Sequence, residues 1–248
     1  MWSRLFPESC PACACATIEG FCAGCRGDFA RVRDPCPVCG LPPDARADCP
    51  GRTSDWRVSR LVAPFAYADP LRHYLHSLKF SHGRRLGRAL GLLLADALDK
   101  EHWDGSVLVA VPLHARRLRE RGYNQALEIS LGLGRALGLE TRLSGAVRVG
   151  AALPQSRLGA RARRANVAAA YRVDGRFFGR GVTIVDDVVT TGATVNALAA
   201  ALLAAGAARV DALAVARTVP PRSSGAEGRP PRSRSCPFAG AGGSSREA

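Results

Sequence analysis

The chain has 248 residues, 47% of them hydrophobic, which is enough for one sizeable α/β domain and a small additional module. Its formal net charge of +14 favours polyanionic partners such as nucleic acid, phosphorylated metabolites or an anionic membrane surface, although a generic arginine-rich surface explains it equally well. Neither a signal peptide nor ~18–20 uninterrupted apolar residues is present, so we expect no membrane span and a cytoplasmic chain with reduced thiols.

The N-terminal segment, residues 1–55, is expected to be a cysteine-rich, zinc-ribbon-like module. Thiolates spaced as CxxC pairs can hold one Zn²⁺ between two such pairs, and a module this small needs a metal for stability. Redox thiols and an iron–sulfur cluster are the alternatives. The candidate metal ligands are Cys10, Cys13, Cys22, Cys25, Cys36, Cys39 and Cys49.

Two ways of sharing these cysteines remain open. The first four, taken alone, make one complete site. The last three lack a fourth ligand, because Arg52 stands where a fourth CxxC pair would end. They either recruit another ligand or have lost their metal, and a pairing of the first CxxC pair with the third is a further alternative.

Short apolar runs alternate with helical segments over residues 56–217, which predicts a doubly wound, mostly parallel sheet. Asp69 is expected to cap the first helix, with Pro70 at its first helical position. Residues 218–248 are rich in Pro, Gly, Ser and Arg and predict a disordered tail. Strands are expected at 58–67, 107–111, 181–185 and 210–215, and helices at 69–80, 83–100, 124–137 and 194–205.

The most informative motif follows the strand at 181–185. Two carboxylates, Asp186 and Asp187, are followed by a loop of small and hydroxylated residues that opens a helix. Unpaired N–H groups at a helix start suit a phosphate, while paired carboxylates suit ribose hydroxyls or Mg²⁺. An ordinary strand-to-helix turn is the bland alternative. The loop residues are Thr190, Thr191, Gly192, Ala193 and Thr194.

This motif resembles the phosphoribosyl diphosphate (PRPP) signature of type I phosphoribosyltransferases. The segments at 111–126 and 153–167 are similar to those of the ComF family, the amidophosphoribosyltransferase-like competence proteins, and the resemblance covers roughly residues 8–218. It implies a phosphoribosyltransferase-type fold in which Asp186 and Asp187 hold the ribose hydroxyls, the following loop holds the 5′-phosphate, and Mg²⁺ accompanies PRPP.

Two further segments are expected, by analogy with the same fold, to act on the pyrophosphate. A basic loop after the strand at 107–111 would bind it, with Arg116 as a catalytic residue beside the two carboxylates. A mobile loop would close over PRPP and carries Arg163, Arg164 and Asn166. A solvated charged face is the alternative for the basic loop, which consists of Pro112, Leu113, His114, Arg116 and Arg117.

Three functions remain open from the sequence. The first is an enzyme that transfers a phosphoribosyl group from PRPP to an unknown acceptor. The second is a zinc-containing competence protein that binds single-stranded DNA and uses PRPP as a regulatory or structural ligand. The third is a scaffold that has kept the fold without the chemistry. Neither the acceptor nor the oligomeric state can be read from the sequence.

Overall fold

The computed structural model describes residues 8–18, 20–78, 83–99, 103, 106–143, 145–148, 171–173 and 177–219. The expected mobile loop, with Arg163, Arg164 and Asn166, and nearly all of the expected tail lie outside these residues. Among the described residues, no helix is long and apolar enough to cross a membrane.

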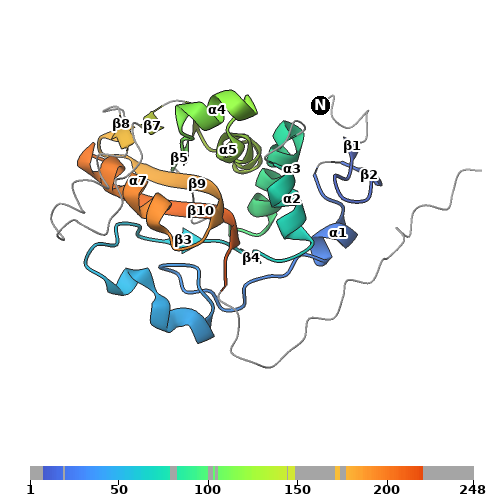
Figure 1. Ribbon diagram of the computed structural model, residues 1–248, viewed down its shortest axis with the longest axis horizontal. Coiled ribbons are helices and arrows are strands. Elements are labelled where there is room, and N and C mark those ends of the chain that lie inside the picture. Colours follow the sequence, from blue (N-terminus) through green and yellow to red (C-terminus); the bar gives the residue numbers. More distant parts are fainter. Residues whose placement is uncertain are drawn as a thin grey trace, which may run out of the picture.

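A six-stranded sheet forms the centre of the molecule (Figure 1), and its six strands pair with one another in parallel. Its strand order is β6-β5-β9-β10, with β3 and β4 both paired to the outer side of β10. The strands are β3 (Leu61–Val62), β4 (Phe65–Ala66), β5 (Val107–Ala110), β6 (Thr141–Arg142), β9 (Gly181–Val189) and β10 (Arg209–Arg217).

Helices cover both faces of the sheet because side chains alternate along each buried strand. In β10, Ala212 and Ala214 pack in the cluster that contains α7, whereas Leu213 and Val215 pack in the cluster that contains α2, α3 and α5. The helices are α2 (Leu71–Ser77), α3 (Gly83–Asp96), α4 (Ala115–Arg121), α5 (Gln125–Leu137) and α7 (Ala193–Ala204). The prediction of a doubly wound, mostly parallel α/β fold is therefore confirmed.

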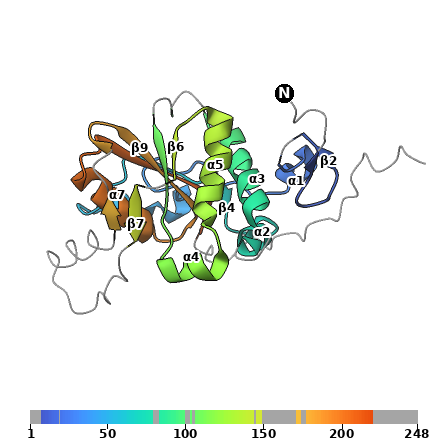
Figure 2. The same ribbon diagram turned by 90° about the horizontal axis from the view of Figure 1, so that it is seen from above.

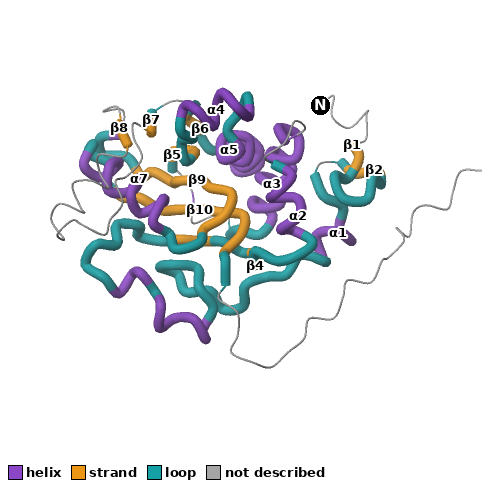
Figure 3. The backbone as a smooth tube through the Cα atoms, viewed as in Figure 1, coloured by secondary structure: helices purple, strands orange, loops and turns teal. Residues whose placement is uncertain are grey.

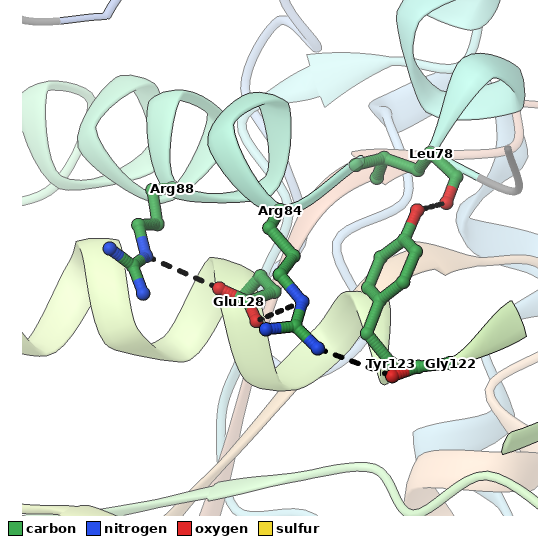
Figure 4. A network of polar contacts seen from close by, with 6 residues as sticks. All are labelled: Leu78, Arg84, Arg88, Gly122, Tyr123 and Glu128. Atoms are coloured by element: carbon green, nitrogen blue, oxygen red, sulfur yellow. Dashed lines mark hydrogen bonds and ion pairs between the residues drawn. The ribbon is translucent and has the colours of Figure 1, made fainter. Parts of the chain in front are cut away.

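Helices α3 and α5 pack closely because glycines lie between their backbones. A Cβ on Gly91 would lie 2.2 Å from the carbonyl oxygen of Ile129, and one on Gly132 would lie 2.3 Å from that of Arg88. Figure 4 shows the polar contacts beside this crossing, where Arg88 and Arg84 of α3 reach the buried Glu128 carboxylate at 3.2 and 3.8 Å. This closely packed helix pair covers one face of the sheet.

The N-terminal cysteines fall in two places. The first group lies with the short hairpin of β1 (Glu8–Ser9) and β2 (Ala16–Thr17) and with α1 (Ala23–Gly27), beyond α3 as seen from the sheet (Figure 2). The second group lies in the coil and 3₁₀ turns that pass beneath β10 in the view of Figure 3. The second group contacts the sheet directly, through the bond from Arg217 of β10 to the carbonyl of Cys39. The domain boundary expected near residue 55, between the cysteine-rich module and the α/β domain, stays a prediction.

Several element boundaries differ from the predictions. The expected strand at 58–67 is reduced to the two short strands β3 and β4, and β9 runs beyond Val185 to Val189, so both carboxylates lie within it. Asp69 does not cap α2; its carboxylate pairs instead with Arg72, and Pro70 occupies the cap position. The antiparallel pair β7 (Ala146–Arg148) and β8 (Tyr171–Val173) was not expected.

Candidate phosphate loop and cysteine clusters

The loop between β9 and α7 contains the five residues expected to hold a phosphate, and we call residues 190–194 the candidate phosphate loop. Thr190, Thr191 and Thr194 are exposed, whereas Gly192 is buried. Gly192 has a φ of 83°, in the left-handed region that favours glycine, and occupies the N-cap of α7. The Thr191 hydroxyl accepts a bond from the Ala193 N–H at 3.3 Å. The loop therefore presents hydroxyls and the amino end of a 12-residue helix to solvent.

The two carboxylates lie one after the other just before this loop. Asp186 Oδ1 accepts from the N–H of Asp187 at 2.9 Å, and Asp187 Oδ1 accepts from the N–H of Val188 at 2.8 Å. Burial raises the pKa of Asp186 well above its ordinary value, and the neighbouring charge of Asp187 raises it further. The second oxygen of each carboxylate is a suitable acceptor for a ligand hydroxyl or a cation.

The segment expected to bind pyrophosphate meets the same edge of the sheet. Strands β5 and β9 are parallel neighbours, and the N–H of Val111 bonds to the carbonyl of Val185 at 2.9 Å. Residues 112–114 form a loop there, but Ala115 begins helix α4, so the expectation of a continuous loop is wrong. His114 caps that helix: its Nδ1 accepts from the N–H of Arg116 at 3.3 Å.

The arginines of this segment are exposed on α4. Arg116 Nε lies 2.8 Å from Glu120 Oε1, so in this structure it pairs within its own helix. The end of β5 is fixed by Asn124, whose Nδ2 donates to the carbonyl of Val111 at 3.0 Å while its Oδ1 caps α5. The roles expected for Pro112, Leu113, His114, Arg116 and Arg117 stay predictions.

The first cysteine cluster consists of Cys10, Cys13, Cys22 and Cys25, whose sulfur atoms all lie within 4.8 Å of one another. Tetrahedral Zn²⁺ with Zn–S bonds of about 2.3 Å holds its sulfurs about 3.8 Å apart. The Sγ atoms of Cys13 and Cys22 are 3.7 Å apart, and neither cysteine is in a disulfide. These four residues can therefore hold a metal such as zinc.

Charge stabilisation in this cluster comes from backbone groups. Burial acts to raise the pKa of Cys10, but backbone N–H groups, including that of Cys22 at 3.4 Å from its sulfur, lower it to about 7. A thiolate at Cys10 is therefore accessible near neutral pH, as metal binding requires.

The second cluster consists of Cys36, Cys39 and Cys49, which also lie within 4.8 Å of one another and can hold a metal. Cys36 and Cys49 have their sulfurs 4.0 Å apart. Burial raises the pKa of Cys39 to about 12. Of the two clusters found among the described residues, this one supplies three ligands, and the alternative pairing of Cys10 and Cys13 with Cys36 and Cys39 is wrong.

Four residues around the candidate phosphate loop escaped the sequence reasoning. Arg217, buried at the end of β10, donates to the carbonyls of Val189 and Thr190. The sequence signal for Arg217 was a charged residue that directly continues the apolar run of a predicted strand. Nothing in the sequence pattern marked the other three. Trp56 and Tyr171 approach the loop or its carboxylates from distant segments, and Asn196, in the first turn of α7, holds the segment that carries Trp56.

No family model matches the chain. Among curated proteins, the DNA utilization protein YhgH of Escherichia coli (strain K12) is 37% identical over 211 residues, which are 81% of this chain and 91% of that protein. Competence protein F of Haemophilus influenzae is 30% identical over 80% of this chain and 91% of its own length. A solved structure, TT1426 from Thermus thermophilus, is 20% identical with a TM-score of 0.35, over 56% of this chain and 86% of that one. With its relatives matched over most of both lengths, the chain belongs to the ComF family.

Proposed function

We propose that this chain binds PRPP, with the 5′-phosphate on the candidate phosphate loop and the ribose hydroxyls on Asp186 and Asp187. One observation carries the proposal: two adjacent, half-buried carboxylates near the end of β9 lead directly into exposed threonines and the amino end of α7. A sugar phosphate matches this order, because its hydroxyls donate to carboxylates while its phosphate accepts from N–H and O–H groups.

The reaction that suits this site is phosphoribosyl transfer to an acceptor nucleophile. The acceptor forms a bond to ribose C1 as the bond from C1 to the pyrophosphate oxygen breaks, and pyrophosphate leaves with the electron pair. Mg²⁺ bound with PRPP would neutralise charge on the pyrophosphate, and the Asp186 and Asp187 carboxylates are suitable partners for it. In this proposal Arg116, Arg117 and the residues of the 112–114 loop approach the pyrophosphate from β5.

A role in DNA uptake or use is the second part of the proposal. The named relatives are a DNA utilization protein and a competence protein, and the net charge of +14 suits a polyanion. The competing candidate is a zinc-containing protein that binds single-stranded DNA without catalysis and in which PRPP is a regulatory or structural ligand.

Calorimetric titration of PRPP with Mg²⁺ tests the site. Binding to the native protein that is lost in the Asp186→Asn/Asp187→Asn variant supports it, and pyrophosphate release with candidate acceptors then tests catalysis. Absence of binding to folded, zinc-loaded protein would contradict the PRPP proposal and leave the DNA-binding candidate.

A further inference from the structure

The buried Arg217 joins the second cysteine cluster to the candidate phosphate loop. Its Nε donates to the carbonyl of Cys39 at 2.9 Å, and its Nη1 donates to the carbonyl of Val189 at 2.9 Å and also to that of Thr190. One guanidinium therefore spans the CxxC turn of the cluster and the first residue of the loop. Cys39 and Thr190 are far apart in the sequence, so this contact depends on the tertiary fold alone.

The position of Arg217 makes these bonds necessary. The residue is only 2% exposed, and a buried guanidinium is costly unless its N–H groups are paired. If the Cys39 carbonyl moved, Arg217 would lose the acceptor of its Nε. The planar, rigid guanidinium fixes both sets of acceptors relative to each other.

With Zn²⁺ bound, the second cluster would also supply a charge that suits Arg217. Three thiolates and one Zn²⁺ together carry a single net negative charge, which complements the positive guanidinium beside them. Metal binding fixes the positions of Cys36 and Cys39 and therefore the backbone of the turn that carries the Cys39 carbonyl. Loss of the metal removes both the charge and the constraint.

The chain that follows this cluster contacts the same loop at a second place. The ring of Trp56 lies against Gly192: a Cβ on this glycine would be 2.7 Å from Trp56 Cη2. Asn196 of α7 holds the same segment, since its Oδ1 accepts from the N–H of Arg57 at 2.6 Å and its Nδ2 donates to the carbonyl of Asp55 at 3.0 Å. The loop is thus contacted at Thr190 by Arg217 and at Gly192 by Trp56.

We propose that the cluster of Cys36, Cys39 and Cys49 controls the candidate phosphate loop through Arg217, so that metal occupancy of the cluster sets the loop's affinity for its phosphate ligand. Arg217 is a positioning residue, because it contacts the loop backbone from the buried side. The affinity part of this inference rests on the proposed PRPP function, whereas the ordering of the loop does not.

The test measures the loop directly by hydrogen exchange with mass spectrometry, on full-length protein whose zinc content is determined by atomic emission. We expect Cys36→Ser to lose one metal ion per chain and to speed exchange over residues 190–196 by more than tenfold. Cys15→Ser, which removes a thiol outside both clusters, is the matched control and should leave the loop unchanged.

Arg217→Met should speed exchange over the same residues while the zinc content is retained. Arg209→Met, at the opposite end of β10 and paired with Asp211, is its control. Arg217→Lys should restore part of the protection, because a single cationic donor can still reach one carbonyl. Circular dichroism and the unfolding midpoint check that each variant is folded.

The decisive readout is the combination of the two changes. If Arg217 is the link, Cys36→Ser causes no further acceleration in the Arg217→Met background. Additive effects, or an unchanged loop in either single variant, would overturn the inference.

A parallel titration with PRPP and Mg²⁺ separates this proposal from the previous one. If affinity falls at least tenfold in Cys36→Ser and in Arg217→Met but not in the controls, both proposals are supported. Unchanged affinity in folded variants of a protein that binds PRPP would overturn the control of affinity alone. If the loop of the native protein responds to the metal while the protein binds no PRPP, that result would contradict the PRPP proposal. The control of the loop by the metal would then stand without PRPP as the ligand.

Discussion

At the scale of single residues, several features around the candidate phosphate loop are unfavourable for the stability of the fold. Asp186 and Asp187 follow one another in the half-buried end of β9, where two like charges would repel each other. Arg217 is buried with its charge facing carbonyl groups, and Gly192 adopts a left-handed backbone. Such features lower stability, and they are typical of places where a ligand contributes the compensating contacts.

Asp186→Asn should make the folded protein more stable at neutral pH. Burial raises the native pKa of Asp186, with Asp187 adding to the shift, so the native state binds a proton that the unfolded state has released. The two states differ in this way at pH values between the unfolded-state pKa of about 3.9 and the raised native-state pKa of Asp186. The free energy of unfolding therefore falls as the pH rises through that window. Thermal unfolding at a series of pH values should show a higher midpoint for the variant above the window.

The difference should vanish below about pH 3, where the carboxyl is protonated in both states. Asp48→Asn, which changes an exposed carboxylate, is the control and should give a small shift. A variant that is less stable than the native protein at neutral pH would contradict the assigned cause of the pKa shift. PRPP binding should be lost despite the higher stability.

The residues of the candidate site were predictable to different degrees. Asp186, Asp187 and the loop of residues 190–194 stand together in the sequence, so a local pattern was enough to single them out. Arg217 and Trp56 reach the same loop from distant segments of the chain, and only the sheet register and the path of the cysteine segment bring them there. A local pattern carries no information of this kind.

At the scale of elements, the contact between α3 and α5 depends on the absence of side chains. Gly87, Gly91 and Gly132 allow the two helices to approach until a Cβ would overlap the facing atoms. Leu90, Leu94, Ile129 and Leu133 then complete the buried interface on the sheet. A helix pair packed this closely tolerates almost no added volume at the crossing.

Gly91→Ala should lower the free energy of unfolding by about 1–3 kcal/mol, the usual effect of overpacking a core, although alanine is the better helix former. The added Cβ would lie 2.2 Å from the Ile129 carbonyl and would force the helices apart. Urea unfolding followed by circular dichroism measures the change. Gly27→Ala in α1, where no atom lies within 4 Å of the added group, should be neutral or slightly stabilising; equal losses in both variants would contradict the packing argument.

Elements with strong periodicity were predicted better than those defined by their neighbours. The strands expected at 107–111 and 210–215 correspond to β5 and β10, and the helix expected at 124–137 corresponds to α5. The pair β3 and β4 is short because each strand exists only where it meets β10. The helix at Ala115–Arg121 was missed since its seven residues are almost all charged and its apolar signal is one leucine.

At the scale of the whole molecule, the two cysteine clusters serve different parts of the fold. The first contacts α3 through the ion pair of Arg26 with Asp96 and the bond from Arg85 to the carbonyl of Ser9. The second contacts the sheet through Arg217. Removing one metal should therefore not be equivalent to removing the other.

Cys25→Ser should release one zinc ion per chain and should unfold the segment around β1, β2 and α1, while the sheet remains intact. The reason is that this segment has few large buried side chains of its own, so a metal held by its four cysteines would supply much of its stability. Limited proteolysis with mass spectrometry should show new cleavage within residues 8–28. Cleavage across the sheet strands would contradict a local role for the first cluster.

DNA affinity should fall steeply with salt if the positive charge serves a nucleic acid. Each phosphate neutralised contributes a slope of about −0.7 to a plot of log affinity against log salt for single strands. Fluorescence anisotropy with a labelled oligonucleotide, at salt concentrations from roughly 50 to roughly 200 mM, measures this slope. No binding at the lowest salt would contradict a direct DNA contact.

Strand β10 has a consequence for the order in which the chain assembles. It lies between β9 on one side and β3 and β4 on the other, so it supplies the backbone partners of strands from both ends of the domain. During synthesis, residues 61–66 leave the ribosome long before 209–217, and until then their sheet edge has no neighbour to join. We therefore expect nascent chains that stop before β10 to expose unpaired strand edges and to depend on chaperones, since such edges promote aggregation.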